Sequence, residues 1–191
     1  QGEKNMSVKT ADREKSIWKS ERLTIMAMMV ALLGVSSYIV IPLPFTVVSI
    51  TAQTMIVNLV GLMLSPQEAL LVMVVWTLLG LTGVPVFTGG AAGPAKVFGP
   101  SGGYIFGFIV AAVLTSVFCK KTKNFKLQIT FIIVAGIPII YAFGAAWMKL
   151  MTGQPWGAVL VQSVLPFIPL DIVKCFAAAA ICRALRRTGR F

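Results

Sequence analysis

Charged residues are absent from long stretches of this chain, and that absence is what most constrains its fold. None lies between Arg22 and Glu68, and the stretches 97–119, 127–148 and 150–170 are uncharged as well. A bilayer core needs about 20 predominantly apolar residues per helix, so these stretches can hold several spans. Only 12% of the 191 residues are charged, against about 25% in soluble domains. We therefore expect an all-α integral membrane protein.

Proline and glycine divide the apolar sequence into six expected transmembrane helices. Proline is favoured in the first turn of a helix and disfavoured inside it. The last helix is therefore expected to begin near Pro169, after a short helix or loop over 155–165. The second and third spans are short, so a re-entrant pair is an alternative to two full crossings. The expected spans are about Leu23–Ile41, Thr51–Leu64, Glu68–Thr82, Tyr104–Cys119, Leu127–Met151 and Pro169–Arg186.

The basic residues predict the orientation. All but three of the 17 Lys and Arg lie in the amino-terminal tail, in the loop 120–126 or after residue 182. Six spans place these segments on one side, and the positive-inside rule makes that side cytoplasmic. We therefore expect both termini in the cytoplasm, with a tail over 1–21, a membrane domain over 22–186 and a basic tail over 187–191. Residues 1–5 precede Met6 and are expected to be a remnant of expression.

Several functional classes are disfavoured by what the sequence lacks. The net charge of +11 is explained by orientation, so no nucleic-acid partner is expected, although contact with anionic membrane lipid is compatible with it. There is no histidine, and Cys119, Cys175 and Cys182 have neither CxxC nor metal-ligand spacing. We expect no cofactor, no metal and no catalytic residues. A channel would need repeated polar rings, which the sequence does not show.

Two charged residues stand inside the last expected span. Asp171 and Lys174 are three residues apart and so share one face of the helix. Ionisable residues in a membrane are costly and normally face the bundle interior or a water-filled cavity. Asp171 lies in the first helical turn, where the helix dipole favours a carboxylate. The pair is either a structural ion pair or part of a polar ligand site.

A glycine-rich outer loop supplies the other candidate contacts. Lys96 is the lone cation there, either solvated or in contact with an anion, and Gly89 and Gly90 permit close backbone approach to a ligand. Gln53 follows the turn at 42–46 and either contacts a ligand or faces solvent. Phe87, Phe98, Tyr104 and Trp156 are candidate aromatic lining. The loop lacks the spacing of a nucleotide-binding P-loop, so the chain shows no means of hydrolysing ATP.

The first span contains small residues four apart, Ala27 and Ala31. Such spacing lets another helix pack closely in a membrane. The partner is either another helix of this chain or a separate protein.

Taken together, these motifs resemble the BioY family, the biotin-specific substrate-binding (S) components of energy-coupling-factor (ECF) transporters. The resemblance rests on the run from Gly83 to Gly90, on Gly99-Pro100-Ser101-Gly102-Gly103-Tyr104, and on 166–174 with its Asp-x-x-Lys. It covers about residues 22–186. Ser101, where the family more often has Thr, and Leu170, where Gly is common, are departures.

The resemblance implies a six-helix S-component fold in a prokaryotic plasma membrane. It implies biotin as the transported ligand, with a transmembrane coupling protein and two cytoplasmic ATPases as partners, and it assigns Ala27 and Ala31 to docking on the coupling protein. We expect Lys96 to meet the biotin carboxylate and Asp171 with Lys174 to lie near the ureido ring, with the reverse roles for the two lysines still open. Another vitamin, such as thiamin or riboflavin, is the alternative ligand, and a membrane enzyme acting on lipid is the alternative class.

Overall fold

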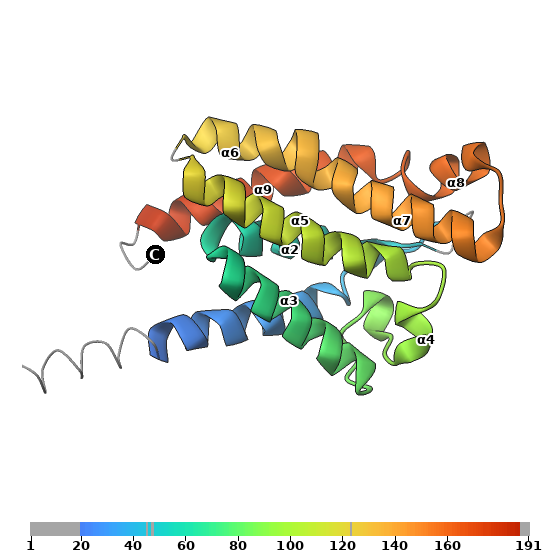
Figure 1. Cartoon of the computed structure of the whole chain (residues 1–191), viewed down its shortest axis with the longest axis horizontal. Helices are drawn as coiled ribbons and strands as arrows, with labels where there is room; N and C mark the ends of the chain where they lie inside the picture. The colour runs from blue at the N-terminus through green and yellow to red at the C-terminus, as the bar shows by residue number, and fades with distance from the viewer. Residues whose placement is uncertain (1–19, 45, 47, 123, 188–191) are drawn as a thin grey trace, which may run out of the picture.

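The structure, a computed structural model, describes residues 20–187 apart from Phe45, Val47 and Lys123. The expected tails therefore lie outside the described residues, except at 20–21 and 187. The described chain is mostly helical and folds as a bundle of roughly parallel and antiparallel helices (Figure 1). Its helices are residues 20–36 (the first helix), α2 (Gln53–Met63), α3 (Pro66–Leu81), α4 (Pro94–Val97), α5 (Gly102–Lys121), α6 (Phe125–Phe131), α7 (Ile137–Thr152), α8 (Trp156–Ser163) and α9 (Ile168–Arg187).

Local sequence signals account for the helix starts. Ser65 caps α3, with Pro66 in the first turn and the Glu68 carboxylate accepting from the Ser65 amide at 2.9 Å; this is a capping box, which satisfies amides that lack partners in the helix. In α9, Pro169 lies in the first turn, as expected, and Asp171 follows it. The short helix expected before α9 is α8. Proline therefore located these boundaries to within a residue or two.

Two features of the backbone differ from the expected uniform helices. The turn after the first helix contains a short antiparallel pair, β1 (Val40–Ile41) and β2 (Ile50–Thr51), with Val40 opposite Thr51. The fifth expected span is a continuous rod of 28 residues, Phe125–Thr152, in which α6 and α7 are joined by η2 (Ile132–Gly136), a π-helical turn. A π-turn holds one extra residue in an otherwise α-helical rod.

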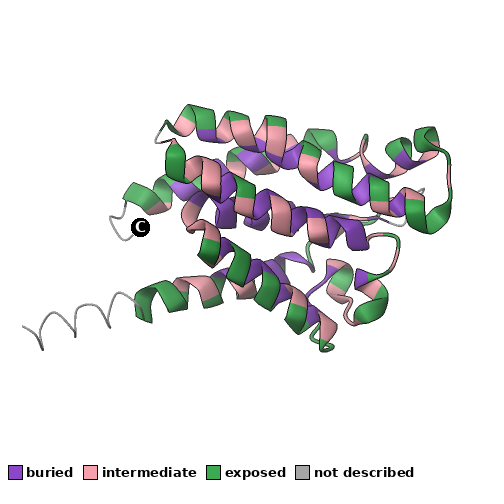
Figure 2. Cartoon of the chain, viewed as in Figure 1, coloured by how far each residue is buried: buried purple, intermediate pink, exposed green. Residues whose placement is uncertain are grey.

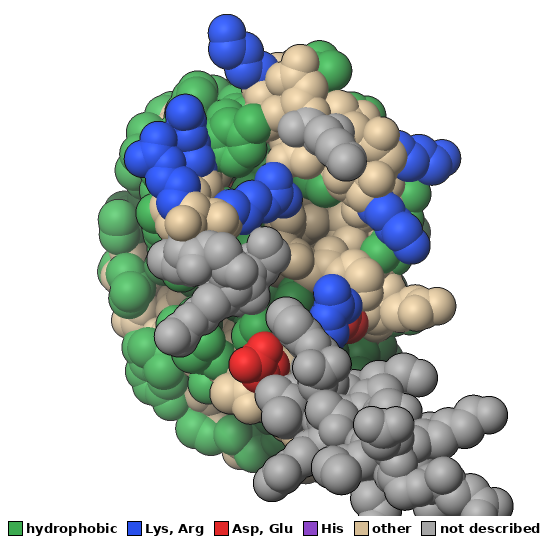
Figure 3. All heavy atoms as spheres, turned by 90° about the vertical axis from the view of Figure 1, so that its left-hand side faces the viewer, with side chains coloured by type: hydrophobic (Ala, Val, Ile, Leu, Met, Phe, Trp, Pro, Cys, Tyr) green, Lys and Arg blue, Asp and Glu red, His purple; other side chains and the backbone are tan. Residues whose placement is uncertain are grey.

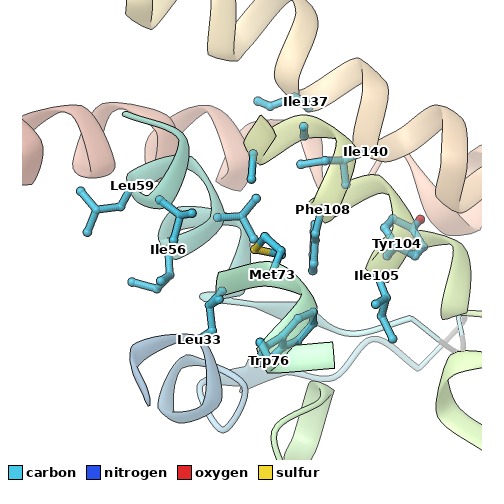
Figure 4. Packing of buried hydrophobic residues seen from close by; sticks show 14 of the residues in the cluster. Leu33, Ile56, Leu59, Met73, Trp76, Tyr104, Ile105, Phe108, Ile137 and Ile140 are labelled. Carbon is cyan, nitrogen blue, oxygen red and sulfur yellow. The ribbon is translucent and has the colours of Figure 1, made fainter. Parts of the chain in front are cut away.

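Small residues let the helices approach closely around α5. An added Cβ at Gly61 of α2 would lie 2.7 Å from Thr115 of α5, and one at Gly144 of α7 would lie 2.4 Å from the Tyr104 ring. Because lipid is as apolar as a protein core, membrane helices associate through such close packing. Buried residues lie on the helix sides that face the interior of the bundle, while exposed residues lie on the outer sides (Figure 2). Leu33, Met73, Phe108 and other core residues meet between the helices (Figure 4).

The two ends of the bundle differ in charge. The first helix begins, and α9 ends, at the same end of the long axis as the α5–α6 loop (Figure 1). We call this the basic end, because Lys and Arg side chains surround it (Figure 3). The described basic residues there are Arg22, Lys120, Lys121, Lys126, Arg183, Arg186 and Arg187. The α4 and α8 helices lie at the opposite, outer end. The described part of the chain agrees with the predicted same-side placement of the basic segments, and the positive-inside rule assigns the basic end to the cytoplasm.

The longer helices of the structure are compatible with six spans, but their lengths do not show that each one crosses the membrane completely. Among the described residues, α5 and the rod Phe125–Thr152 are long and apolar enough to cross a membrane, and α8 with α9 would form a third, bent span. The α2 and α3 helices are apolar but shorter. The number six therefore stays a prediction, while the helical membrane-protein class is confirmed.

Candidate functional site

A cavity with about 570 Å³ of empty volume opens toward the outer end of the bundle. Residues from β2 and the turn before it, from the glycine-rich loop and from six helices line it. They are Val48, Ser49, Thr51, Gln53, Thr54, Trp76, Phe87, Thr88, Lys96, Ser101, Tyr104, Ile105, Phe108, Ile140, Tyr141, Phe167, Asp171 and Lys174. Five of the predicted contacts are thus brought to one cavity: Asp171, Lys174, Lys96, Gln53 and Tyr104.

Asp171 is held in place by two donors. Its side chain is only 4% exposed, in the first turn of α9. Lys174 Nζ lies 2.8 Å from one carboxylate oxygen, and the Tyr141 hydroxyl donates to the other at 2.8 Å. An ionised carboxylate offers about four acceptor positions. With two of them occupied, Asp171 can still accept from N–H groups of a ligand in the cavity.

Lys96 lies on α4, away from α9 in the sequence, and its ammonium has no carboxylate partner. It is half-buried on α4, which begins after Gly93, whose φ is 87°. The Lys96 ammonium makes no hydrogen bond or ion pair with any residue of the described chain, although the Lys96 backbone amide donates to the Gly93 carbonyl at 3.2 Å. Burial lowers the pKa of this lysine, because removing water disfavours the ammonium form. Lys96 is therefore a lone cation at the edge of the cavity, suited to an anionic ligand group.

The charges that line the cavity do not cancel. Asp171 and Lys174 form an ion pair, and Lys96 adds one positive charge. A ligand with a single negative charge would neutralise the site. The same lining also offers a carboxylate acceptor, so a molecule with N–H donors at one end and an anion at the other matches it.

Gln53 is buried rather than solvent-facing, with 1% of its surface exposed. Its Nε2 donates to the Val86 carbonyl at 3.2 Å, and the Thr88 hydroxyl donates to its Oε1 at 3.2 Å. Trp76 Nε1 donates to the same Val86 carbonyl at 3.1 Å. This network ties α2 and α3 to the glycine-rich loop and fixes the loop wall of the cavity.

Aromatic and aliphatic side chains form the rest of the wall. Trp76 of α3 packs edge-on against Phe87, with ring centroids 5.2 Å apart, and its ring centroid lies 6.4 Å from that of Phe108. The Tyr104 hydroxyl donates to the Ser163 carbonyl. Trp76, Tyr104, Ile105, Phe108 and Ile140 project from three helices into one region (Figure 4). Such apolar walls with a few polar groups are typical of ligand pockets.

Some predicted contacts lie elsewhere. Phe98 and Trp156 are 62% and 52% exposed and do not line the cavity, so they were wrong as lining residues. Gly89 and Gly90 directly follow the lining residue Thr88 and have φ of 73° and 71°. An added Cβ at Gly90 would lie 2.8 Å from the Tyr38 ring. The glycines shape the loop here, and their contact with a ligand stays a prediction.

The sequence interpretation missed several lining residues, above all Tyr141, Trp76 and Phe108. Tyr141 stands in a span without charge, and no polar neighbour in sequence marks it. Its only signal was a hydroxyl in an apolar helix. Ala27 and Ala31 are exposed on the first helix, so packing within the described chain does not use them. No group of three or more His, Cys, Asp or Glu in the described chain could hold a metal.

Comparison with known proteins agrees with this geometry. Residues 7–191 match the BioY family. "Biotin transporter BioY2" of Lactococcus lactis is 32% identical over 173 residues, which cover 88% of this chain and 94% of the relative. "Biotin transporter BioY" of Thermotoga maritima is 34% identical, covering 82% and 90%. A crystal structure described as the S-component for biotin from an ECF-type ABC transporter superposes with a TM-score of 0.83 and 31% identity, over 88% of this chain and 92% of that one.

The match over nearly the whole chain and the shared fold confirm the resemblance found in the motifs. They also agree with an integral membrane protein of a prokaryotic plasma membrane and with a transport role rather than an enzymatic one. The chain belongs to the BioY family.

Proposed function

We propose that this chain binds biotin in the outer cavity and serves as the S component of an ECF transporter. The observation that supports it most is the cavity's charge arrangement: an ion-paired carboxylate on α9 and an unpaired lysine on α4. Biotin has N–H donors and a carbonyl on its ureido ring, an apolar valerate chain, and a carboxylate at the far end. Each part has a counterpart in the lining.

The ureido ring is assigned to the α9 side. Asp171 keeps acceptor positions for the N–H groups of the ureido ring. Tyr141 and Lys174 hold the Asp171 carboxylate in its orientation. The apolar wall of Trp76 and Phe108 suits the fused rings and the valerate chain. Burying that surface contributes about 25 cal/mol per Å² of apolar area.

The carboxylate is assigned to Lys96. Lys174 is already paired with Asp171, whereas Lys96 has no partner in the described chain. An anion beside Lys96 would offset the cost of burying its charge. A cationic vitamin such as thiamin would instead leave this lysine facing a like charge, which favours biotin over thiamin.

Energy would come from partner proteins, a transmembrane coupling protein and two cytoplasmic ATPases, since this sequence has no P-loop. The first helix supports a docking role. Ala27 and Ala31 are exposed, and the exposed Met28 and Leu32 lie beside them. Small residues on such a face allow the close backbone approach by which membrane helices associate.

Calorimetry on the purified full chain tests the ligand. We expect saturable one-to-one binding of biotin at micromolar concentration or below, with weaker or no binding of thiamin and riboflavin. No heat at micromolar biotin, or tighter binding of another vitamin, would overturn the proposal.

A matched pair of variants tests docking. Replacing Ala27 and Ala31 together by leucine should leave biotin affinity unchanged and prevent association with the coupling protein. The control replaces Ala142 and Ala146, which are equally spaced and exposed on α7. Equal loss of association in both double variants would show that the first helix is not the docking face.

A further inference from the structure

The basic end holds a groove that the transport proposal does not use. Its lining comes from the start of α6 and the last turns of α9, and consists of Asn124, Phe125, Lys126, Arg183, Arg186 and Arg187. Four of these six residues carry a positive charge. They come from segments far apart in sequence that the fold brings side by side (Figure 1).

The positive charge of the groove is not compensated within the described chain. The carboxylates described are Glu21, Glu68 and Asp171. Glu68 pairs with Arg22 at 2.6 Å, and Asp171 with Lys174 at the outer end. None of the three lines the groove. Four cations without a carboxylate attract an anion.

Arg186 is already positioned by neutral acceptors. Its Nη2 donates to the Leu62 carbonyl at 2.7 Å, and its Nη1 donates to Gln128 Oε1 at 3.2 Å. These bonds fix the guanidinium without neutralising it. Arg183, also on α9, has a defined contact as well. Its guanidinium lies over the Phe125 ring, 5.9 Å from the ring centroid. The groove thus has two cations in fixed places.

Exposed side chains, two of them apolar, also lie along α6 and the η2 turn that follows it. Leu127, Thr130 and Val134 are exposed and lie three or four residues apart, so they share one face of the rod. Leu127 is 50% exposed and Val134 68%. A free phosphate ion would contact only the cations, whereas a lipid would also lay an acyl chain along this face.

We infer that this groove binds the phosphate of an anionic membrane lipid at the cytoplasmic surface. The guanidinium groups of α9 and Lys126 contact the phosphate oxygens, since Arg matches phosphate with paired N–H donors. The acyl chains lie against the exposed face of α6. The site is independent of the biotin cavity, which is at the other end of the bundle.

Lipid retention by the purified full chain, measured by native mass spectrometry in mixed micelles, tests the inference. The probes are phosphatidylglycerol, phosphatidylcholine and inorganic phosphate. The test variant is Arg183→Gln/Arg187→Gln, which spares Arg186 because that residue also ties α9 to α2. The control is Lys120→Gln/Lys121→Gln, which removes equal charge at the same end but outside the groove.

Wild type should retain phosphatidylglycerol in preference to phosphatidylcholine, and added salt should weaken that retention. A basic side chain near an anionic lipid surface is worth about fivefold in affinity, so the test variant should lose about 25-fold. The control should lose far less. Calorimetry with biotin checks that both variants are folded.

Three results would overturn the inference. Equal loss in both variants would show diffuse attraction rather than a site. Displacement of phosphatidylglycerol by inorganic phosphate at equal concentration would show that the site selects the free ion. Unchanged lipid retention in Arg183→Gln/Arg187→Gln, together with lost association with the coupling protein, would show that the groove is a protein contact.

Discussion

Replacing Lys96 by methionine tests most directly whether Lys96, rather than Lys174, contacts the biotin carboxylate. Methionine keeps an unbranched apolar side chain and removes the charge. We expect the variant to lose affinity for biotin but to keep its affinity for biotinamide, in which the carboxylate is replaced by a neutral amide. The selectivity of the loss carries the argument, because a general defect in folding would weaken both ligands.

The size of the effect follows from the position of Lys96. A hydrogen bond to a charged group contributes about 1.5–3 kcal/mol, and exposed ion pairs contribute about 0–1 kcal/mol. Lys96 is half-buried, so solvent screens part of its charge. We expect about 2 kcal/mol, which is about a 30-fold rise in Kd.

Isothermal titration calorimetry of the full chain with both ligands measures the effect. Lys149→Met is the matched control, because Lys149 donates to the Gln154 carbonyl and lies over the Trp156 ring, outside the cavity. Equal losses for biotin and biotinamide in Lys96→Met would refute the assignment. If Lys174→Met shows the selective loss instead, the roles of the two lysines are reversed.

Three further outcomes are expected. Because burial lowers the pKa of Lys96 and a carboxylate pairs with the ammonium form, biotin affinity should be highest where Lys96 is protonated. It should then fall as the pH rises through that lowered pKa; calorimetry of Lys96→Met across the same range should lack this component. Asp171→Asn should weaken biotin binding and, by leaving Lys174 without a charge partner, lower the free energy of unfolding; unchanged affinity would show that the carboxylate does not contact the ligand. Gly144→Ala should destabilise the chain by about 1–3 kcal/mol, since the added Cβ would lie 2.4 Å from the Tyr104 ring, and an unchanged thermal unfolding midpoint would contradict that packing.

Charge and proline located the main features of the fold in advance. Helix α9 begins at Ile168, one residue before the proline that predicted its start, and ends at Arg187, one residue after the expected end. Asp171 and Lys174 are prominent in sequence because an ionisable group is costly in an apolar span. The same cost explains why both lie at the cavity in the structure.

The residues that line the cavity were harder to predict from sequence than the helix boundaries, for a physical reason. In a soluble helix the buried face is marked by hydrophobic periodicity. The α3 helix is apolar on both its lipid-facing and buried sides, so nothing in its pattern marks Trp76 as the residue that points inward. Tyr141 on α7 was missed because it stands in an uncharged stretch and no polar neighbour in sequence marks it. The β1–β2 pair is two residues long on each strand, which is too short to show a period.

The unpaired cations connect the two ends of the molecule. A cation in a membrane protein is stable next to water, a carboxylate or a bound anion. In the described chain, Arg22 and Lys174 have carboxylate partners, whereas Lys96 and the groove cations of α9 do not. Each unpaired set also lies beside an apolar surface. A ligand that joins one anionic group to an apolar body therefore suits both places, biotin at the outer end and an anionic lipid at the basic end. Enclosure separates them: the outer cavity is walled by α3, α5 and α7, while the groove at the basic end is more open.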